Sequence, residues 1–186
     1  MGPSIIVALC LFVWWLEPFS ADYLAMQRSA IANGYYWQFI TANLVHTNFI
    51  HLCLNMAGVI LLWAVHGQYF STLQYLLACL FIGFVVTIGL YITDESLAWY
   101  GGFSGILHGL FMLGCYKDIQ NGIRSSWLLL AGIWLKIGYE QFSGQSEVVA
   151  ELIAANVAVD AHLYGAIGGF FWVFGEYLLT LKKRPS

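Results

Sequence analysis

The chain has 186 residues, of which 60% are hydrophobic, 17% are aromatic and only 9% are charged. A soluble domain carries roughly 25% charged residues, so this composition excludes an ordinary soluble domain and indicates one membrane domain over residues 1–186. The formal net charge of −3 and the lack of a basic stripe argue against a nucleic-acid partner.

Six apolar segments follow one another along the chain. They cover approximately residues 4–16, 49–66, 72–92, 103–116, 126–142 and 157–181. Backbone groups in lipid must pair within the protein, and these runs lack the alternation of barrel strands, so each segment is expected to be a helix. We therefore predict an all-α polytopic membrane protein with six transmembrane helices. The first segment is shorter than the about 20 residues of a span. Either it continues past Pro18 or the chain has been shortened at its start.

The basic residues predict the orientation of these helices. Lys117 and Arg124 lie between the fourth and fifth segments, and Lys182, Lys183 and Arg184 follow the sixth. With six spans both groups fall on the same side, which the positive-inside rule makes the cytoplasm, together with both termini. The opposite side would then hold residues 17–48 and four acidic residues, Asp94, Glu95, Glu147 and Glu151.

The fourth segment is too short to cross a membrane. Residues 103–116 would rise about 20 Å as a helix, against a hydrocarbon core of about 30 Å. If Lys117 marks the cytoplasmic surface, Ser104 lies roughly 10 Å below the opposite one. Irregular backbone at that depth is tolerated only inside protein or beside a water-filled cavity. The sequence therefore predicts a recessed active-site cavity with Ser104 at its floor.

Ser104 stands between Gly102 and Gly105. A serine hydroxyl is a poor nucleophile until a base removes its proton, and His162, at the start of the sixth segment, suits that role. Each residue alone has a structural reading, because serine and histidine also pack or cap membrane helices. Their placement on the same outer side favours a nucleophile and its base. Free N–H groups at the start of the fourth helix can help to hold an oxyanion.

Two glycines follow the histidine on its own helical face. Gly165 and Gly169 lie three and seven residues after His162. Small residues let another helix approach closely, so we expect the sixth segment to pack against the fourth.

The second segment carries two side chains that can donate hydrogen bonds to an oxyanion. His51 and Asn55 are spaced i,i+4 and share a helical face. Helix–helix hydrogen bonding is the alternative reading of this pair. His46, earlier in the chain, is expected to brace the loop.

No carboxylate clearly completes a triad. Asp160 lies two residues before His162 and projects to another side of the helix, so we predict a serine–histidine dyad, with Asp160 holding the entry loop or meeting substrate. His108, one turn into the fourth segment, is expected to line the cavity or to brace His162. Lys136 and Glu140, spaced i,i+4 in the fifth segment, most simply neutralise each other.

At these residues the chain resembles the rhomboid family of intramembrane serine proteases. Residues 102–105 match the family's G-x-S-G nucleophile motif, and residues 161–169 match its A-H-x-x-G-x-x-x-G base motif. The second segment matches its H-x-x-x-x-H-x-x-x-N pattern with His46, His51 and Asn55. The resemblance covers segments two to six. It implies that Ser104 is the nucleophile and His162 the base, and that His51, Asn55 and the Ser104 amide form the oxyanion hole.

Further residues resemble one branch of the family. His108 takes the place of a tyrosine that stacks beneath the base in many bacterial rhomboids. Residues 159–162 and the pattern Lys136-x-x-x-Glu140-Gln141 resemble the rhombosortases. That branch implies substrates with a C-terminal Gly-Gly motif, a membrane helix and a basic tail. The family's Trp-Arg pair in the first outer loop is Trp37-Gln38 here, so the bracing of that loop is expected to differ.

We therefore expect an endopeptidase of the bacterial inner membrane that cleaves membrane-anchored proteins near the outer face of the lipid bilayer, with no cofactor or metal. One alternative is a metal-dependent membrane hydrolase, since imidazole binds zinc well. Its candidate ligands are His46, His51, His108 and His162. Another alternative is a transporter or a non-catalytic rhomboid-like binding protein, because polar residues inside membrane spans suit both. The physiological substrate, the scissile bond and the oligomeric state stay open at this level.

Overall fold

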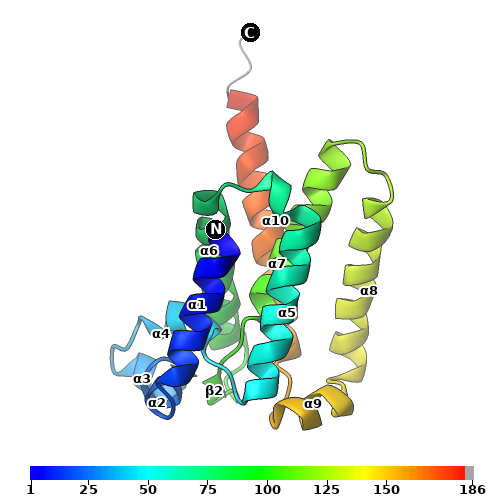
Figure 1. Cartoon of the computed structure of the whole chain (residues 1–186). Coiled ribbons are helices and arrows are strands. Elements are labelled where there is room, and N and C mark those ends of the chain that lie inside the picture. The colour runs from blue at the N-terminus through cyan, green and yellow to red at the C-terminus, as the bar shows by residue number, and fades with distance from the viewer. Residues whose placement is uncertain (183–186) are drawn as a thin grey trace.

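The computed structural model describes residues 1–182 and is built around six long helices that run up and down side by side (Figure 1). These helices are α1 (Gly2–Trp15), α5 (Phe49–His66), α6 (Thr72–Thr93), α7 (Ser104–Gln120), α8 (Ser126–Ser143) and α10 (Val159–Lys182). Each coincides with one predicted apolar segment, so the helical class is confirmed. Among the described residues, two helical stretches, 49–69 and 72–93, are long and apolar enough to cross a membrane, and α1 is a shorter apolar helix.

The two ends of the described chain lie toward the same end of the bundle (Figure 1). Near that end Lys117 of α7 forms a salt bridge with Glu176 of α10. The basic group predicted after the sixth segment continues in Lys183 and Arg184, which lie outside the described residues.

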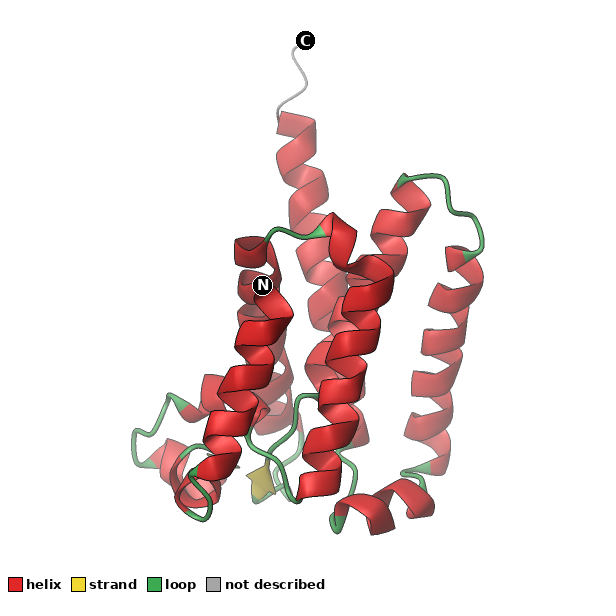
Figure 2. Ribbon diagram, in the orientation of Figure 1, coloured by secondary structure: helices red, strands yellow, loops and turns green. Residues whose placement is uncertain are grey.

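The first helix does not continue past Pro18. It ends at Trp15, and a separate short helix, α2 (Phe19–Tyr23), begins one residue after the proline. Of the two alternatives, the one in which the first helix continues past Pro18 is therefore wrong. The following outer stretch is folded into α3 (Arg28–Ala32), α4 (Gln38–Thr41) and the 3₁₀ turn η1 (Ala42–Leu44), which Figure 2 shows gathered at one end of the bundle.

Gln38 braces this outer stretch with uncharged hydrogen bonds. Its side chain is fully buried. The Oε1 atom accepts the Gln27 backbone N–H at 2.9 Å, and the Nε2 atom donates to the Tyr23 carbonyl at 3.2 Å. A buried amide with both ends satisfied avoids the cost of an unpaired polar group. The loop is therefore held without the arginine of the family pattern.

A short β-pair, which the sequence did not predict, ties the outer stretch to the loop before α7. Strand β1 (Met26–Gln27) pairs antiparallel with β2 (Trp99–Tyr100), with Met26 opposite Tyr100. Two residues a strand are too few to show alternation in the sequence. The Gly102 N–H also donates to the Ala42 carbonyl at 3.2 Å. Both contacts fix the path by which the chain enters α7.

Helix α7 lies at the centre of the bundle and packs most closely on α10. The contact follows the glycine face described above. A Cβ atom on Gly165 would lie 1.9 Å from the Gly105 carbonyl oxygen, and one on Gly169 would lie 2.6 Å from that of Gly109. The two backbones therefore touch directly, as small residues allow in membrane helices.

A buried polar network holds the opposite end of α7. Asp118 accepts hydrogen bonds from the Tyr69 hydroxyl at 2.7 Å and the Ser126 hydroxyl at 2.7 Å, and it contacts His66 Nε2 at 3.2 Å. These partners come from η2 (Gly67–Tyr69), α8 and α5. Because these hydrogen bonds let Asp118 be buried, α7 continues to Gln120, four residues beyond the end of the predicted segment at residue 116.

Candidate active site

Ser104 is the first residue of α7 and faces His162, which lies in the first turn of α10. The Ser104 Oγ and His162 Nε2 atoms are 3.2 Å apart, within hydrogen-bonding reach. His162 is buried and Ser104 is half-buried. The close crossing of Gly105 and Gly165 lies beside this pair, so the helix contact sets its spacing.

A carboxylate reaches the other side of the histidine. Glu140 Oε2 lies 2.9 Å from His162 Nδ1, while Glu140 Oε1 lies 2.9 Å from Lys136 Nζ. The predicted pairing of Lys136 with Glu140 is confirmed, but the expectation that no carboxylate meets the base is wrong. Asp160 instead accepts a hydrogen bond from Gln141 at 3.0 Å. Sequence spacing could not reveal the contact, because Glu140 and His162 lie on different helices.

His108 stacks against the ring of His162. The two ring centroids are 4.1 Å apart, with an angle of 17° between the planes. His108 Nδ1 lies 2.8 Å from the Ser104 carbonyl oxygen, and His108 Nε2 lies 2.8 Å from Lys136 Nζ. A carbonyl only accepts and an ammonium only donates, so His108 is neutral with its proton on Nδ1.

The same cluster could be considered as a metal site. Potential ligand atoms of His108, Glu140 and His162 lie within 4.8 Å of one another. However, the Lys136 ammonium contacts all three residues, since its Nζ atom is also 3.2 Å from His162 Nδ1. A metal ion would have to displace this resident cation or be repelled by it. His46 and His51, the other two candidate ligands, do not belong to this group.

The start of α5 lies against the loop that leads to Ser104. Gly102 has a positive φ of 149°, and a Cβ atom there would lie 3.0 Å from Cε1 of His51. Glycine therefore suits this position both for its backbone angle and for the closeness of the imidazole. The Tyr100 hydroxyl donates to the Gly102 carbonyl at 3.0 Å. The His51 ring thus lies against Gly102, two residues before Ser104, where the backbone is braced by Tyr100.

His51 and Asn55 differ in the hydrogen bonds that they make. The Thr47 hydroxyl donates its single hydrogen to the Ile153 carbonyl at 2.7 Å, so at 3.0 Å it accepts from His51 Nδ1. The Thr47 N–H contact to the same nitrogen is longer, at 3.4 Å, and we take the shorter one to set the tautomer. Asn55 Nδ2, by contrast, is a buried donor with no acceptor among the described residues. An unused buried donor of this kind is rare in native proteins.

His46 braces the turn before α5. It is buried, its Nδ1 atom donates to the Leu44 carbonyl at 3.1 Å, and its ring meets that of His51 at a centroid distance of 5.0 Å. Burial lowers the pKa of His46 to about 3, and the neighbouring His51 acts in the same direction. His46 is therefore uncharged in the folded protein at neutral pH.

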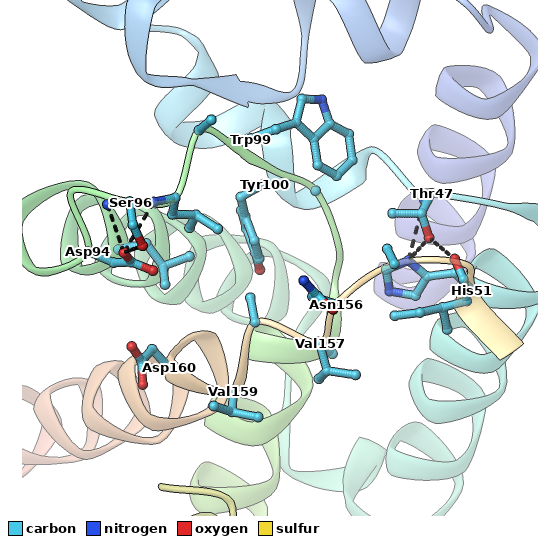
Figure 3. A pocket seen from close by; sticks show the side chains of 18 residues that line it. Thr47, His51, Asp94, Ser96, Trp99, Tyr100, Asn156, Val157, Val159 and Asp160 are labelled. Carbon is cyan, nitrogen blue, oxygen red and sulfur yellow. Dashed lines mark hydrogen bonds between the residues drawn. The ribbon is translucent and has the colours of Figure 1, made fainter. Parts of the chain in front are cut away.

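A pocket of about 460 Å³ has Ser104 and His51 in its wall. Figure 3 shows Thr47 and His51 on one side and Asp94 on the other, with Asp160 at the start of α10. The loop after α9 (Glu147–Ile153) and the loop before α7 supply most of the remaining wall. The Ser96 hydroxyl donates to Asp94 at 2.6 Å and lowers the pKa of that carboxyl. Ser104 thus opens onto a pocket whose wall holds both polar and apolar residues.

A bundle of apolar helices in which a serine at a pocket contacts a histidine of a neighbouring helix is the arrangement of an intramembrane hydrolase. The family model of the rhomboid domain matches residues 33–178, and the chain belongs to the rhomboid family. This is a family of integral membrane proteins, and membership implies intramembrane protease activity on membrane-embedded proteins.

One relative supports the same assignment along nearly the whole chain. The protein is 25% identical over 192 residues to "Putative rhomboid protease YdcA" of Bacillus subtilis (strain 168). The alignment covers 97% of this chain and 89% of the relative.

Proposed function

We propose that the protein is an intramembrane serine endopeptidase in which Ser104 is the nucleophile and His162 is the general base. The distance of 3.2 Å between Ser104 Oγ and His162 Nε2 carries this proposal. As the Oγ–carbon bond forms, the hydroxyl proton moves to Nε2. His162 then gives that proton to the leaving amine as the carbon–nitrogen bond breaks. Water, deprotonated by the same nitrogen, releases the acyl group.

The oxyanion of this reaction would be held mainly by Asn55 and the Ser104 amide. Asn55 Nδ2 is a buried donor without an acceptor among the described residues, as an empty oxyanion site requires. The Ser104 N–H lies in the first turn of α7, where amides have no acceptor within the helix. His51 would complete the set in its other tautomer, with the proton on Nε2 and Nδ1 accepting the Thr47 N–H instead of donating to the Thr47 hydroxyl.

The whole chain would form one domain of six spans in the bacterial inner membrane, with both termini in the cytoplasm. Six long helices of alternating direction support this placement (Figure 1). Lys117 in the last turn of α7 and Arg124 in the loop that follows lie at one end of the bundle, and the pocket beside Ser104 lies at the other. This orientation puts cleavage near the outer face of the bilayer.

The substrates would be membrane-anchored proteins. The residues that resemble the rhombosortase branch favour substrates of the kind which that branch cleaves. Residues 159–162 and the pattern Lys136-x-x-x-Glu140-Gln141 carry the likeness to that branch, and both Lys136 and Glu140 lie against His162. A scissile segment next to a Gly-Gly motif is small and easily unwound, which suits a pocket of limited size beside a half-buried serine.

Reconstitution in liposomes tests this function. The wild-type protein should cleave a reporter that carries a Gly-Gly motif, a membrane helix and a basic tail, and Ser104→Ala should not. A matched reporter without the Gly-Gly motif should be cleaved more slowly. Equal turnover by Ser104→Ala would overturn the assignment, and inhibition by a chelator would favour the metal-dependent alternative.

A further inference from the structure

We propose that Glu140 fixes the proton of His162 on Nδ1 and holds Lys136 away from that nitrogen, while Lys136 holds His108 beneath the ring, so that Ser104, His162 and Glu140 act as a relay. This inference rests on the proposed protease function and adds two positioning residues to it. Its basis is a chain of contacts that joins α7, α8 and α10 around one imidazole ring.

The first step concerns the tautomer of His162. An ionised carboxylate can only accept hydrogen bonds, so the contact of 2.9 Å to Glu140 Oε2 places the proton on Nδ1. The Nε2 atom then keeps its lone pair and faces Ser104 Oγ at 3.2 Å. That is the form which can take the serine proton. The Glu140 side chain is 14% exposed and that of His162 is 7% exposed, so water competes little for the contact.

The second step concerns Lys136, which could act on the same nitrogen in the opposite sense. Its Nζ atom lies 3.2 Å from His162 Nδ1, close enough to donate a proton to a lone pair there. It is drawn away by Glu140 Oε1 at 2.9 Å and by His108 Nε2 at 2.8 Å. Glu140 therefore orients His162 and also binds the Lys136 ammonium, which keeps that ammonium from donating to Nδ1. Without the carboxylate, Lys136 would donate to Nδ1 and the proton of His162 would move to Nε2, where it blocks the reaction.

The third step concerns the platform under the base. His108 donates from Nδ1 to the Ser104 carbonyl at 2.8 Å and accepts from Lys136 on Nε2. Its ring is thus fixed at both nitrogens and lies nearly parallel to that of His162. Lys136 and the Ser104 carbonyl thus hold His108 in place from its two nitrogens. Glu140 holds His162 itself.

Two variants test the relay, with Glu147→Gln on exposed α9 as the matched control for the loss of an acid. In Glu140→Gln the amide carbonyl faces Lys136 and the amide NH₂ faces His162 Nδ1, which selects the wrong tautomer. We expect kcat to fall by about 10²-fold or more with KM unchanged, since a misplaced tautomer costs up to about 10⁴-fold in a serine protease triad. Lys136→Met combined with Glu140→Gln frees the amide to turn and accept from Nδ1, so this double variant should be at least about tenfold faster than Glu140→Gln alone.

Nitrogen-15 NMR of labelled histidine in liposomes reads the tautomer without any turnover, with the His162 signal assigned from His162→Gln. The wild type and the double variant should carry the proton on Nδ1, and Glu140→Gln should carry it on Nε2. An unchanged kcat in Glu140→Gln, no gain in the double variant or the same tautomer in all three proteins would each overturn the relay. If the wild type neither cleaves its reporter nor reacts at Ser104, the proposed protease function is wrong. The NMR spectra would still show whether Glu140 sets the tautomer of His162.

Discussion

The crossing of α7 and α10 should be intolerant of a single methyl group. Gly165→Ala would place a Cβ atom 1.9 Å from the Gly105 carbonyl oxygen, whereas non-bonded atoms rest at about 3.5 Å. The helices would have to separate by more than about 1 Å. Ser104 Oγ and His162 Nε2, which are 3.2 Å apart, sit on the two sides of this crossing and would leave hydrogen-bonding range.

The expected loss is large for so small a change. A displacement of about 1 Å at the reacting groups costs about 10²-fold in rate, and overpacking costs about 1–3 kcal/mol of stability. Gly175→Ala is the matched control, because it lies on the same helix and its Cβ atom would meet nothing within 4 Å. That change should leave the rate unaltered and add a few tenths of a kcal/mol or more to stability, as alanine favours helix by up to about 1 kcal/mol.

Reporter cleavage in liposomes and thermal unfolding in detergent measure the two effects. Gly165→Ala should cleave about 10²-fold more slowly than Gly175→Ala at a temperature where both are folded. Wild-type cleavage by Gly165→Ala would refute the argument that the glycine contact sets the spacing of nucleophile and base.

Three further changes probe other parts of the molecule. Asn55→Ala should lower kcat by about 10²–10³-fold, the effect of one oxyanion donor, with little change in thermal midpoint because Nδ2 has no acceptor among the described residues; a loss of stability without a loss of rate would contradict the role. Asp118→Ala should destabilise the fold by on the order of 3–5 kcal/mol, since it leaves the buried His66 and Ser126 and the half-buried Tyr69 without their partner. The rate of the folded fraction should not change, because Ser104 lies about 20 Å away along α7; a lowered rate there would show coupling between the ends. His46→Gln should flatten the pH dependence of stability. Burial lowers the pKa of His46 to about 3, so the unfolded chain binds the proton first and the folded state loses about 2 kcal/mol by pH 5 relative to pH above 6.5. Thermal midpoints at pH 7.5 and pH 5 should therefore lie closer together in the variant, and an equal gap would contradict this.

The long helices could be predicted because hydrophobic length is a local property of the sequence. All six apolar segments became helices, and the glycine spacing after His162 pointed to the face that meets α7. The helix ends were less accurate, as α7 continues to Gln120 beside a polar network in which Asp118 meets His66 and Tyr69, both distant in sequence. The strand pair of residues 26–27 and 99–100 was missed for the same reason, since its two halves are far apart in the chain.

The largest omission at the site was the contact between Glu140 and His162. The two residues lie on helices from different segments. The i,i+4 spacing had also made Lys136 a sufficient partner for Glu140, so no second partner was sought. One signal was present nevertheless. Charged residues inside an apolar segment are costly and are usually retained for function, and this pair stood in an otherwise apolar stretch. Their position along the segment, on the outer side with His162, could have suggested the base as a third member.

Covalent labelling tests the nucleophile most directly. A fluorophosphonate probe reacts with an activated serine by forming an Oγ–phosphorus bond and releasing fluoride, and the modified peptide is identified by mass spectrometry. We expect a single modified residue, Ser104, in the wild type and in the exposed control Ser146→Ala. We expect no modification in Ser104→Ala. In His162→Gln we expect modification to be slower by about 10²-fold or more. Modification of another serine, or equal labelling of Ser104→Ala, would contradict the assignment.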